Sequence, residues 1–454
     1  MTRVRRRLGP LLVLGVFLAG CAASAGRALP PSSPRARNVI LFIGDGMGLS
    51  IYTSTRVWKV GATGKLAIDS LPYTAVCSTY SYDYIVTDSA PSATSILAGV
   101  KARNDVIGEA SDAEPGSLSA AGSGREGTPA KTICELAAEH GLATGLVTTT
   151  TVTHATPASC YAHIHHRDLE SDIAAQLLLP HFGNLPPDLV LGGGRQFFLP
   201  ADASDPEYPG IHGVRSDGRD LTAELGQRGY AYVWNEAQFT GLDLKATKRL
   251  LGLFEPSHMQ FEGVRAVAPR EPGLVEMTEM AIRILSQRPE GYFLMVEGGR
   301  IDHALHANNA QGAILETATF DEAVRRALEM TSASDTLIVV TADHSHPLTL
   351  NGYPALGRTA TGAEDVEASR RNLMGAGGKD LHGNDYPALS FASGPGALEP
   401  RPAMADRPAL IPLSSSTHAG EDVFVAARGP GAQRVRGFMT NTQIYDIMRA
   451  AFGF

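Results

Sequence analysis

Acidic and histidine side chains in several separate segments are the residues best suited to hold metal ions. In segment 297–306, Asp302 and His306 are four residues apart, so one helical turn can present both to the same centre. Mixed Asp/His ligands are typical of Zn²⁺, whereas carboxylate and hydroxyl oxygens are typical of Mg²⁺. Any one such pair could equally be a salt bridge or a buried polar contact, so only the combination indicates several metals. The candidate ligands are Asp45, Thr156, Glu297, Asp302, His306, Asp343, His344 and His418.

Ser89 is the candidate nucleophile. It lies just before a run, 91–97, that is predicted to be helical, with Pro91 in the first turn. The free amides and the positive dipole of a helix start attract phosphate and favour a deprotonated serine, and a neighbouring Zn²⁺ would lower the serine pKa further. The alternative is that Ser89 is an ordinary helix cap.

Arg167 is the candidate phosphate ligand, because a guanidinium can bind two phosphate oxygens at once. The alternative is a surface ion pair with Asp168. The spacing of the neighbouring His163, His165 and His166 does not suit a metal site, and we interpret them as polar surface.

Apolar runs of strand length alternate with segments of helical periodicity, which favours a mostly parallel sheet with helices on both faces, a three-layer α/β/α sandwich. Four of the five runs end in polar clusters. Because open α/β sheets bind ligands beyond the carboxyl ends of their strands, these clusters are predicted to converge on one site. The predicted strands are 39–43, 144–149, 292–296, 337–341 and 423–427, and the predicted helices are 130–140, 274–287 and 310–330.

Two long segments rich in Gly, Pro, Ala and Ser, 105–128 and 348–415, are interpreted as surface insertions. Since 348–415 lies between the Asp343-His344 pair and His418, we expect it to overhang the site. The catalytic domain is predicted to span 38–454.

The N-terminus has the pattern of a bacterial export signal, with four arginines, an apolar run and small residues before Cys21. The apolar run is too short to span a membrane stably. Residues 1–20 are predicted to be a lipoprotein signal peptide, Cys21 the lipidated residue, and 21–37 a flexible tether; an ordinary signal with a chance cysteine is the alternative. We expect an exported periplasmic or cell-surface protein that contacts the membrane only through its lipid anchor.

Charge and cysteine content limit the remaining options. The chain has 39 Lys and Arg against 47 Asp and Glu, a net charge of −8, and removal of residues 1–20 takes away four arginines and brings it to −12. No dense basic run follows the signal, so nucleic-acid binding is not expected. Cys77, Cys134 and Cys160 are an odd number in an oxidising compartment, so one disulfide could form but no pair is predicted.

The chain resembles the alkaline phosphatase family over residues 37–452. The matching segments occur in the family's order: NVILFIGDGMG, VTDSAPSAT, GVKARNDVIG, TTTTVTHATPASCYAH, GLFEP, EGGRIDHALHANN, VVTADHSH and SSTHAGEDVFVAARGP. The resemblance implies hydrolysis of phosphate monoesters, with Ser89 phosphorylated and Arg167 holding the phosphate. It also implies one zinc on Asp302, His306 and His418, a second on Asp45, Asp343 and His344, and a magnesium ion on Asp45, Thr156 and Glu297.

His154 and His303 refine the resemblance, because the animal type of the family has histidine at both positions and the enterobacterial type has Asp and Lys. We therefore expect both on the substrate side of the metals. The resemblance to the animal type extends to a calcium site. Glu271 stands there in place of an Asp, and its spacing from Glu255 is one residue longer than in the animal type. The alternative is that these acids are solvated surface groups. The implied calcium ligands are Glu207, the carbonyl of Phe254, Glu255 and Glu271.

The family is commonly dimeric, so the resemblance also implies a homodimer.

Two other functions fit part of the sequence pattern. A related metallohydrolase acting on phosphodiesters or sulfates could use the same strand-end site, but the C/S-x-P-x-R context of sulfatases does not surround Ser89. A lipoprotein that only binds metal or phosphate would have no use for a nucleophile at a helix start.

Overall fold

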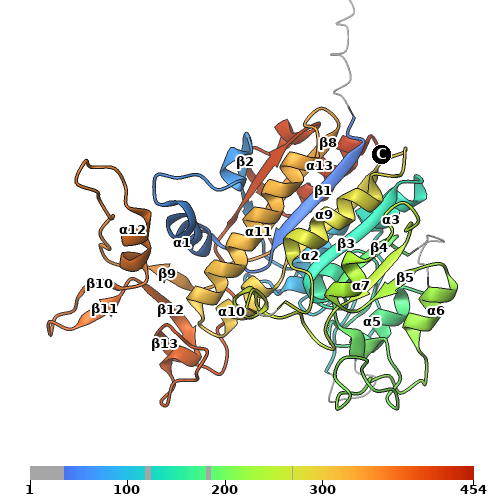
Figure 1. Ribbon diagram of the computed structural model, residues 1–454, viewed down its shortest axis with the longest axis horizontal. Helices are drawn as coiled ribbons and strands as arrows, with labels where there is room; N and C mark the ends of the chain where they lie inside the picture. Colours follow the sequence, from blue (N-terminus) through green and yellow to red (C-terminus); the bar gives the residue numbers. More distant parts are fainter. Residues whose placement is uncertain (1–34, 118–123, 180–185, 268) are drawn as a thin grey trace, which may run out of the picture. The chain divides into compact units, whose positions relative to one another are not determined.

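The centre of the fold is a ten-stranded sheet with the order β15-β2-β14-β8-β1-β7-β3-β4-β6-β5 (Figure 1). The computed structural model describes residues 35–117, 124–179, 186–267 and 269–454. Neighbouring strands are parallel except at β14, which is antiparallel to both β8 and β2. The predicted mostly parallel sheet is therefore confirmed. Its strands are β1 (Asn38–Gly44), β2 (Tyr73–Ser78), β3 (Ala143–Thr151), β4 (Leu189–Gly193), β5 (Ala231–Val233), β6 (Leu250–Leu253), β7 (Tyr292–Gly298), β8 (Thr336–Ala342), β14 (Val423–Arg428) and β15 (Gly437–Thr440).

The four strands β8, β1, β7 and β3 form the buried middle of the sheet. Every residue of β3, β7 and β8 is buried, as is every residue of β1 after the first. Their continuous apolar runs are typical of parallel strands covered on both faces. The register aligns their ends, because Gly44 of β1 lies opposite Gly298 of β7 and Ala342 of β8. The residues that follow these strands therefore leave the sheet at the same level.

Helices cover the sheet in two separate groups, which confirms the three layers. α9 and α11 pack together and contact β7, whereas α2, α3 and α13 pack together and reach the same central strands from the other face. Figure 1 shows α9 and α11 crossing in front of the sheet. The helices are α1 (Leu49–Val60), α2 (Ser89–Ala98), α3 (Ile133–Glu139), α4 (Ala155–Ala158), α5 (Glu170–Gln176), α6 (Leu221–Gln227), α7 (Glu236–Thr240), α8 (Glu262–Arg265), α9 (Leu274–Leu285), α10 (Arg300–His306), α11 (Ala310–Met330), α12 (Val366–Leu373) and α13 (Thr442–Phe452).

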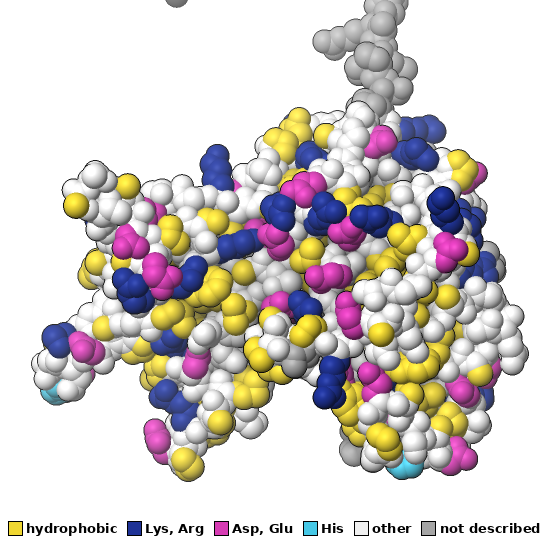
Figure 2. All heavy atoms as spheres, viewed as in Figure 1, with side chains coloured by type: hydrophobic (Ala, Val, Ile, Leu, Met, Phe, Trp, Pro, Cys, Tyr) yellow, Lys and Arg dark blue, Asp and Glu magenta, His cyan; other side chains and the backbone are white. Residues whose placement is uncertain are grey.

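The outer surface of α9 and α11 carries charges of both signs. Arg325 pairs with Glu322 and Glu329 along α11, and Arg326 reaches Glu279 of α9 at 2.9 Å. Figure 2 shows basic and acidic side chains interleaved over this face. The pattern is that of a solvated helix face with local ion pairs, each of which contributes little to stability.

Segment 348–415 has secondary structure of its own. It contains α12, the hairpin of β10 (Ala376–Lys379) and β11 (Asp385–Pro387), and a small sheet of β9 (Leu348–Leu350), β12 (Leu389–Gly394) and β13 (Ala409–Pro412). Its last residue reaches the candidate site, since Ser415 Oγ lies 3.1 Å from His306 Nδ1. In the first insertion, the described part is tied down by the bridge between Ile107 and Ile164.

The signal peptide 1–20, Cys21 and most of the tether 21–37 lie outside the described residues. Ala36 is buried and its amide donates to the Ala451 carbonyl at 2.8 Å, so residue 36 already belongs to the folded unit. Cys77, Cys134 and Cys160 are buried free thiols. Across the described ranges, no helix is both long and apolar enough to cross a membrane.

Candidate active site

The aligned ends of β1, β7 and β8 place three carboxylates side by side. Glu297 in β7 lies opposite Ile43, Asp45 follows β1, and Asp343 follows β8. Their side chains are 0% exposed. The structure thus brings these candidate ligands, which belong to separate segments of the sequence, to one edge of the sheet.

His418 reaches the same edge by a different route. Because β14 is antiparallel to β8, with Val425 opposite Thr341, its first residues lie at the carboxyl edge of the parallel strands. His418 comes shortly before β14 and not after it. The reversed strand is therefore what brings this histidine to the site.

Asp45, Asp343 and His344 form the first group that could hold a cation, with one ligand atom from each within 4.8 Å of the others. Asp343 Oδ1 accepts from the amides of Gly46 and His344 at 3.0 and 2.9 Å, which leaves Oδ2 free. Burial and the Asp343 charge raise the pKa of Asp45 well above its usual range. Burial lowers the pKa of His344, but Asp343 and Asp45 outweigh it and raise that pKa to about 10. A proton therefore competes with metal at this imidazole.

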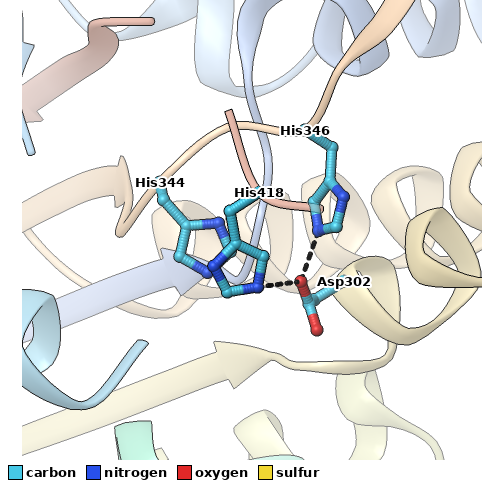
Figure 3. Close-up of side chains that lie close together, drawn as sticks. All are labelled: Asp302, His344, His346 and His418. Atoms are coloured by element: carbon cyan, nitrogen blue, oxygen red, sulfur yellow. Dashed lines mark hydrogen bonds and ion pairs between the residues drawn. The ribbon is translucent and has the colours of Figure 1, made fainter. Parts of the chain in front are cut away.

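A second group consists of Asp302, His344, His346 and His418, whose ligand atoms also lie within 4.8 Å (Figure 3). Asp302 Oδ1 accepts from His346 Nε2 at 2.5 Å and is 3.6 Å from His418 Nε2. His306 completes the group, because its Nε2 is 3.3 Å from Asp302 Oδ2 and 3.1 Å from His418 Nε2. The sequence analysis missed His346, although its place two residues after His344 was a usable sign.

The tautomers of three imidazoles fit a metal-binding role. Nδ1 of His306, His344 and His418 lies 2.6, 3.2 and 3.0 Å from the carbonyls of Ser416, Ser345 and Thr87 respectively. A carbonyl only accepts, so each Nδ1 carries a proton and Nε2 of each neutral ring presents a lone pair to the cluster. At His344 the raised pKa favours a second proton on Nε2, which must be lost before this lone pair is available. The Nε2 atoms of His306 and His418 therefore face each other as two acceptors, an arrangement that a cation stabilises.

Asp45, His154 and Glu297 form a third group, again within 4.8 Å. Burial raises the pKa of Glu297 to about 7. Thr156 is also fully buried at this point. Several oxygen atoms of these groups and of the neighbouring Thr156 are buried without a hydrogen-bond partner among the described residues, which fits divalent cations: Asp45 Oδ2, Thr156 Oγ1, Glu297 Oε1 and Asp343 Oδ2.

Ser89 is the first residue of α2, two residues earlier than the predicted helix start. The helix is capped by Asp88, whose side chain accepts from the Ala90 amide at 2.6 Å, so the interpretation of Ser89 as the cap is wrong. Its Oγ is buried, 3.2 Å from His344 Nε2 and 3.4 Å from Asp45 Oδ1. Because Asp88 takes the capping role, the Ser89 hydroxyl is available to the cation groups.

Arg167 faces the same pocket of about 460 Å³ as Ser89. Its guanidinium donates to Asp88 Oδ1 at 3.0 Å and to His154 Nε2 at 2.9 Å. The alternative of a surface pair with Asp168 is therefore wrong. Burial lowers the pKa of Arg167, but Asp88 and Asp45 outweigh this and raise it, so the guanidinium stays charged.

The sequence analysis interpreted His163, His165 and His166 as polar surface, but two of these three histidines are buried. His163 is buried, with Nδ1 at 2.6 Å from the Gly108 carbonyl and Nε2 at 3.0 Å from Glu135. His166 is buried as well, and only His165 is partly exposed. His163 ties the 105–128 insertion to α3 and has a structural role.

The four residues of the implied calcium site lie in a region that is more enclosed than solvated surface. Glu255 and Glu271 are buried, so the alternative interpretation of these acids as solvated surface groups is wrong for both. Burial and the Glu255 charge raise the pKa of Glu271 to about 8. Glu207 lies 3.3 Å from the guanidinium of Arg195, a fully buried residue that the sequence analysis missed.

Removing divalent cations with a chelator should lower the free energy of unfolding, by about 2.7 kcal/mol for each ion present at a hundredfold excess over its dissociation constant. The loss should be larger at pH 8 than at pH 5. Asp45 and Glu297 have raised folded-state pKa values, so in the cation-free protein the stability that they contribute is fully present below their unfolded values of 3.8 and 4.5 and is lost as pH rises, through about 7 for Glu297. Thermal unfolding at both pH values, with and without chelator, measures this. An equal melting temperature in all four samples would contradict the metal site.

Comparison with known proteins agrees with this geometry. The alkaline phosphatase family model matches residues 36–454. The alkaline phosphatase of Gadus morhua is 37% identical over 457 residues, which cover 92% of this chain and 92% of that protein. The tissue-nonspecific alkaline phosphatase isozyme of Gallus gallus is also 37% identical over 457 residues, covering 92% of this chain and 84% of that protein.

Solved structures share the fold. The alkaline phosphatase of Thermus thermophilus superposes with a TM-score of 0.71 at 28% identity, over 97% of this chain and 96% of that one. That of the Antarctic bacterium TAB5 has a TM-score of 0.67 at 27% identity, over 93% of this chain and 99% of that one. This chain belongs to the alkaline phosphatase family of metal-dependent phosphoric monoester hydrolases.

Proposed function

We propose that this protein hydrolyses phosphate monoesters by transferring the phosphoryl group to Ser89 and then to water, in a site that holds two Zn²⁺ and one Mg²⁺. The observation that carries the proposal is the position of Ser89 Oγ, within 3.4 Å of His344 and Asp45 and in one pocket with Arg167. A protein that only binds phosphate does not need a hydroxyl at this point.

The donor atoms support this choice of ions. The proposed zinc sets, Asp302 with His306 and His418 and Asp45 with Asp343 and His344, combine nitrogen and oxygen. The proposed magnesium set offers only oxygen: Asp45, Thr156 and Glu297. When bound, the cations would lower the pKa of the serine hydroxyl and of water and neutralise charge on the ester oxygen. A variant of the TAB5 enzyme has Mg bound in its M3 site, which supports magnesium in this family.

The chain's own residues supply the positioning. Ser89 Oγ forms a bond to phosphorus as the bond to the ester oxygen breaks, and water later attacks the same phosphorus and releases Ser89. Arg167 binds phosphoryl oxygens with the donors that it does not give to Asp88 and His154. Asp88 caps α2 and holds Arg167, so one carboxylate orients both the nucleophile and the phosphate ligand. His154 and His303 line the pocket as substrate-side residues.

A phosphodiesterase or sulfatase activity on the same site is the alternative. Arg167 and the three cation groups provide charge for the dianionic head of a monoester, which carries more negative charge than a diester. Rates for an aryl phosphate monoester, a diester and a sulfate, measured on one preparation, separate these functions. Faster turnover of the diester or the sulfate would contradict the proposal.

Ser89→Ala should reduce kcat by several orders of magnitude and abolish the phosphoenzyme, because no other hydroxyl takes its place at the start of α2. Labelling with a ³²P-monoester followed by acid quench measures the covalent intermediate. Ser92→Ala, a change of the same kind in the same helix, is the control, since the Ser92 hydroxyl donates to the Asp343 carbonyl at 2.6 Å. Stoichiometric labelling of the Ser89→Ala protein would refute the assignment.

We also propose that the protein forms a homodimer, which light scattering on the mature domain can test.

We further propose that the protein is exported and anchored to a membrane by lipid on Cys21, as the N-terminal pattern suggests. Cys21→Ser should move the protein from the detergent phase to the aqueous phase while its specific activity stays unchanged, because each buried CH₂ of an acyl chain contributes about 0.8 kcal/mol to membrane binding. Phase partitioning of both forms measures this. Equal partitioning would contradict the anchor.

The calcium site on Glu207, the Phe254 carbonyl, Glu255 and Glu271 is a further proposal, supported by the burial of two of its acids. Ca²⁺ should raise the melting temperature, and more so above pH 8, because the raised pKa of about 8 at Glu271 makes protons compete with the ion below that pH. Glu271→Gln should abolish the response. A flat calcium titration of the wild type would remove the site.

A further inference from the structure

We propose that His258 is an additional substrate-binding residue that donates a hydrogen bond from Nε2 to an oxygen of the phosphoryl group, directly or through one water. The inference rests on the proposed phosphomonoesterase function. His258 did not emerge from the sequence analysis, because it belongs to none of the metal-binding or nucleophile segments.

The position of the ring supports this assignment. His258 lies in the loop after β6 and lines the pocket that also contains Ser89 and Arg167. Its ring centroid is 4.4 Å from that of His303 and 5.7 Å from that of His154. Since His154 is also 5.5 Å from His303, the three imidazoles form one continuous wall of the pocket, and His154 in this wall contacts Arg167.

The hydrogen bonds of the wall determine which nitrogen of His258 can donate. The amide of Thr151 donates to His258 Nδ1 at 3.0 Å, so Nδ1 is an acceptor and the proton is on Nε2. His303 is held in the same way, because the Arg300 guanidinium donates to its Nδ1 at 2.7 Å. Both rings therefore carry Nε2–H. Among the described residues, Nε2 of His258 forms no hydrogen bond to a protein acceptor, so this donor is available to a ligand in the pocket.

A neutral donor suits this location. Burial, with Arg300 and Arg167, lowers the pKa of His258 to about 4. A positive charge on His258 would be repelled by the guanidiniums of Arg167 and Arg300 and by the proposed cations. A neutral N–H adds a hydrogen bond to phosphate without this repulsion. The phosphoryl oxygens are the strongest acceptors that a monoester brings into the pocket.

The competing explanation is that His258 only holds the backbone at Thr151. Thr151 has a second restraint, since its hydroxyl donates to Glu170 Oε2 at 2.8 Å. A purely structural His258 would thus affect metal content or melting temperature when replaced, but not phosphate affinity in the properly folded enzyme. The two roles can be separated by experiment.

The test uses His258→Asn and His258→Gln in the full-length, metal-loaded enzyme, with inorganic phosphate as the probe. Asn keeps an acceptor for the Thr151 amide but cannot reach the Nε2 position, whereas Gln places an amide donor close to it. One neutral hydrogen bond corresponds to about a three- to tenfold change in affinity. His258→Asn should raise both the Ki for phosphate and the KM for an aryl monoester by this factor, with kcat nearly unchanged, and His258→Gln should recover part of the loss.

His382→Asn, the same change at an exposed histidine in the turn between β10 and β11, is the control and should leave Ki and KM as in the wild type. Unchanged Ki and KM in His258→Asn would overturn the proposal, as would a change that is fully explained by lost metal or a lower melting temperature. Failure of the wild type to hydrolyse any monoester would instead remove the proposed function, which distinguishes the two results.

Discussion

The structure depends on one electrostatic constraint: four carboxylates are buried side by side where the central strands end. Asp45, Glu297 and Asp343 are fully buried, and Asp302 is 4% exposed. Like charges in a dry environment repel strongly, which is why Asp343 and Asp302 add to the effect of burial on the pKa of Asp45. The in-register pairing of β1 with β7 and β8 prevents these groups from moving apart. Only protons or cations can offset such a concentration of charge.

The imidazoles around this charge are held from behind by the protein backbone. Carbonyls of Ser416, Ser345 and Thr87 accept from Nδ1 of three histidines, while His346 orients Asp302 by a 2.5 Å contact. These outer contacts fix the orientation of each imidazole ring before any ligand arrives. A site arranged in this way loses little energy to reorganisation when charge develops in a reaction. On the substrate side, Asp88 gives the same kind of support to Arg167.

The sequence predicted best what depends on local patterns. The central strands were recognisable from their continuous apolar runs, and helix 310–330 was found with the bounds of α11, because twenty-one residues give several full periods. The strands β4 and β6 were missed because four or five buried residues show no periodicity. The direction of β14 also could not be read from sequence, since it is decided by pairing partners far along the chain.

The candidate site was predictable to the extent that its residues belong to recognisable segments. His346 and His258 were overlooked because their roles come from what they touch in three dimensions, the Asp302 carboxylate and the Thr151 amide. Arg195 was overlooked for the same reason, as its ion pair with Asp205 forms only after the chain folds. Asp88 was not singled out, because its double contact with α2 and Arg167 is visible only in the structure.

The reversed strand β14 also determines when the centre can be completed during biosynthesis. Asp45 emerges near the start of the domain, but His418 and the strand that delivers it come close to the end. A nascent or truncated chain that stops before β14 lacks the last imidazole, however well its early strands have folded. Such dependence on distant contacts slows folding in general. The group of acidic and histidine side chains that includes His418 is thus complete only when the chain is nearly complete.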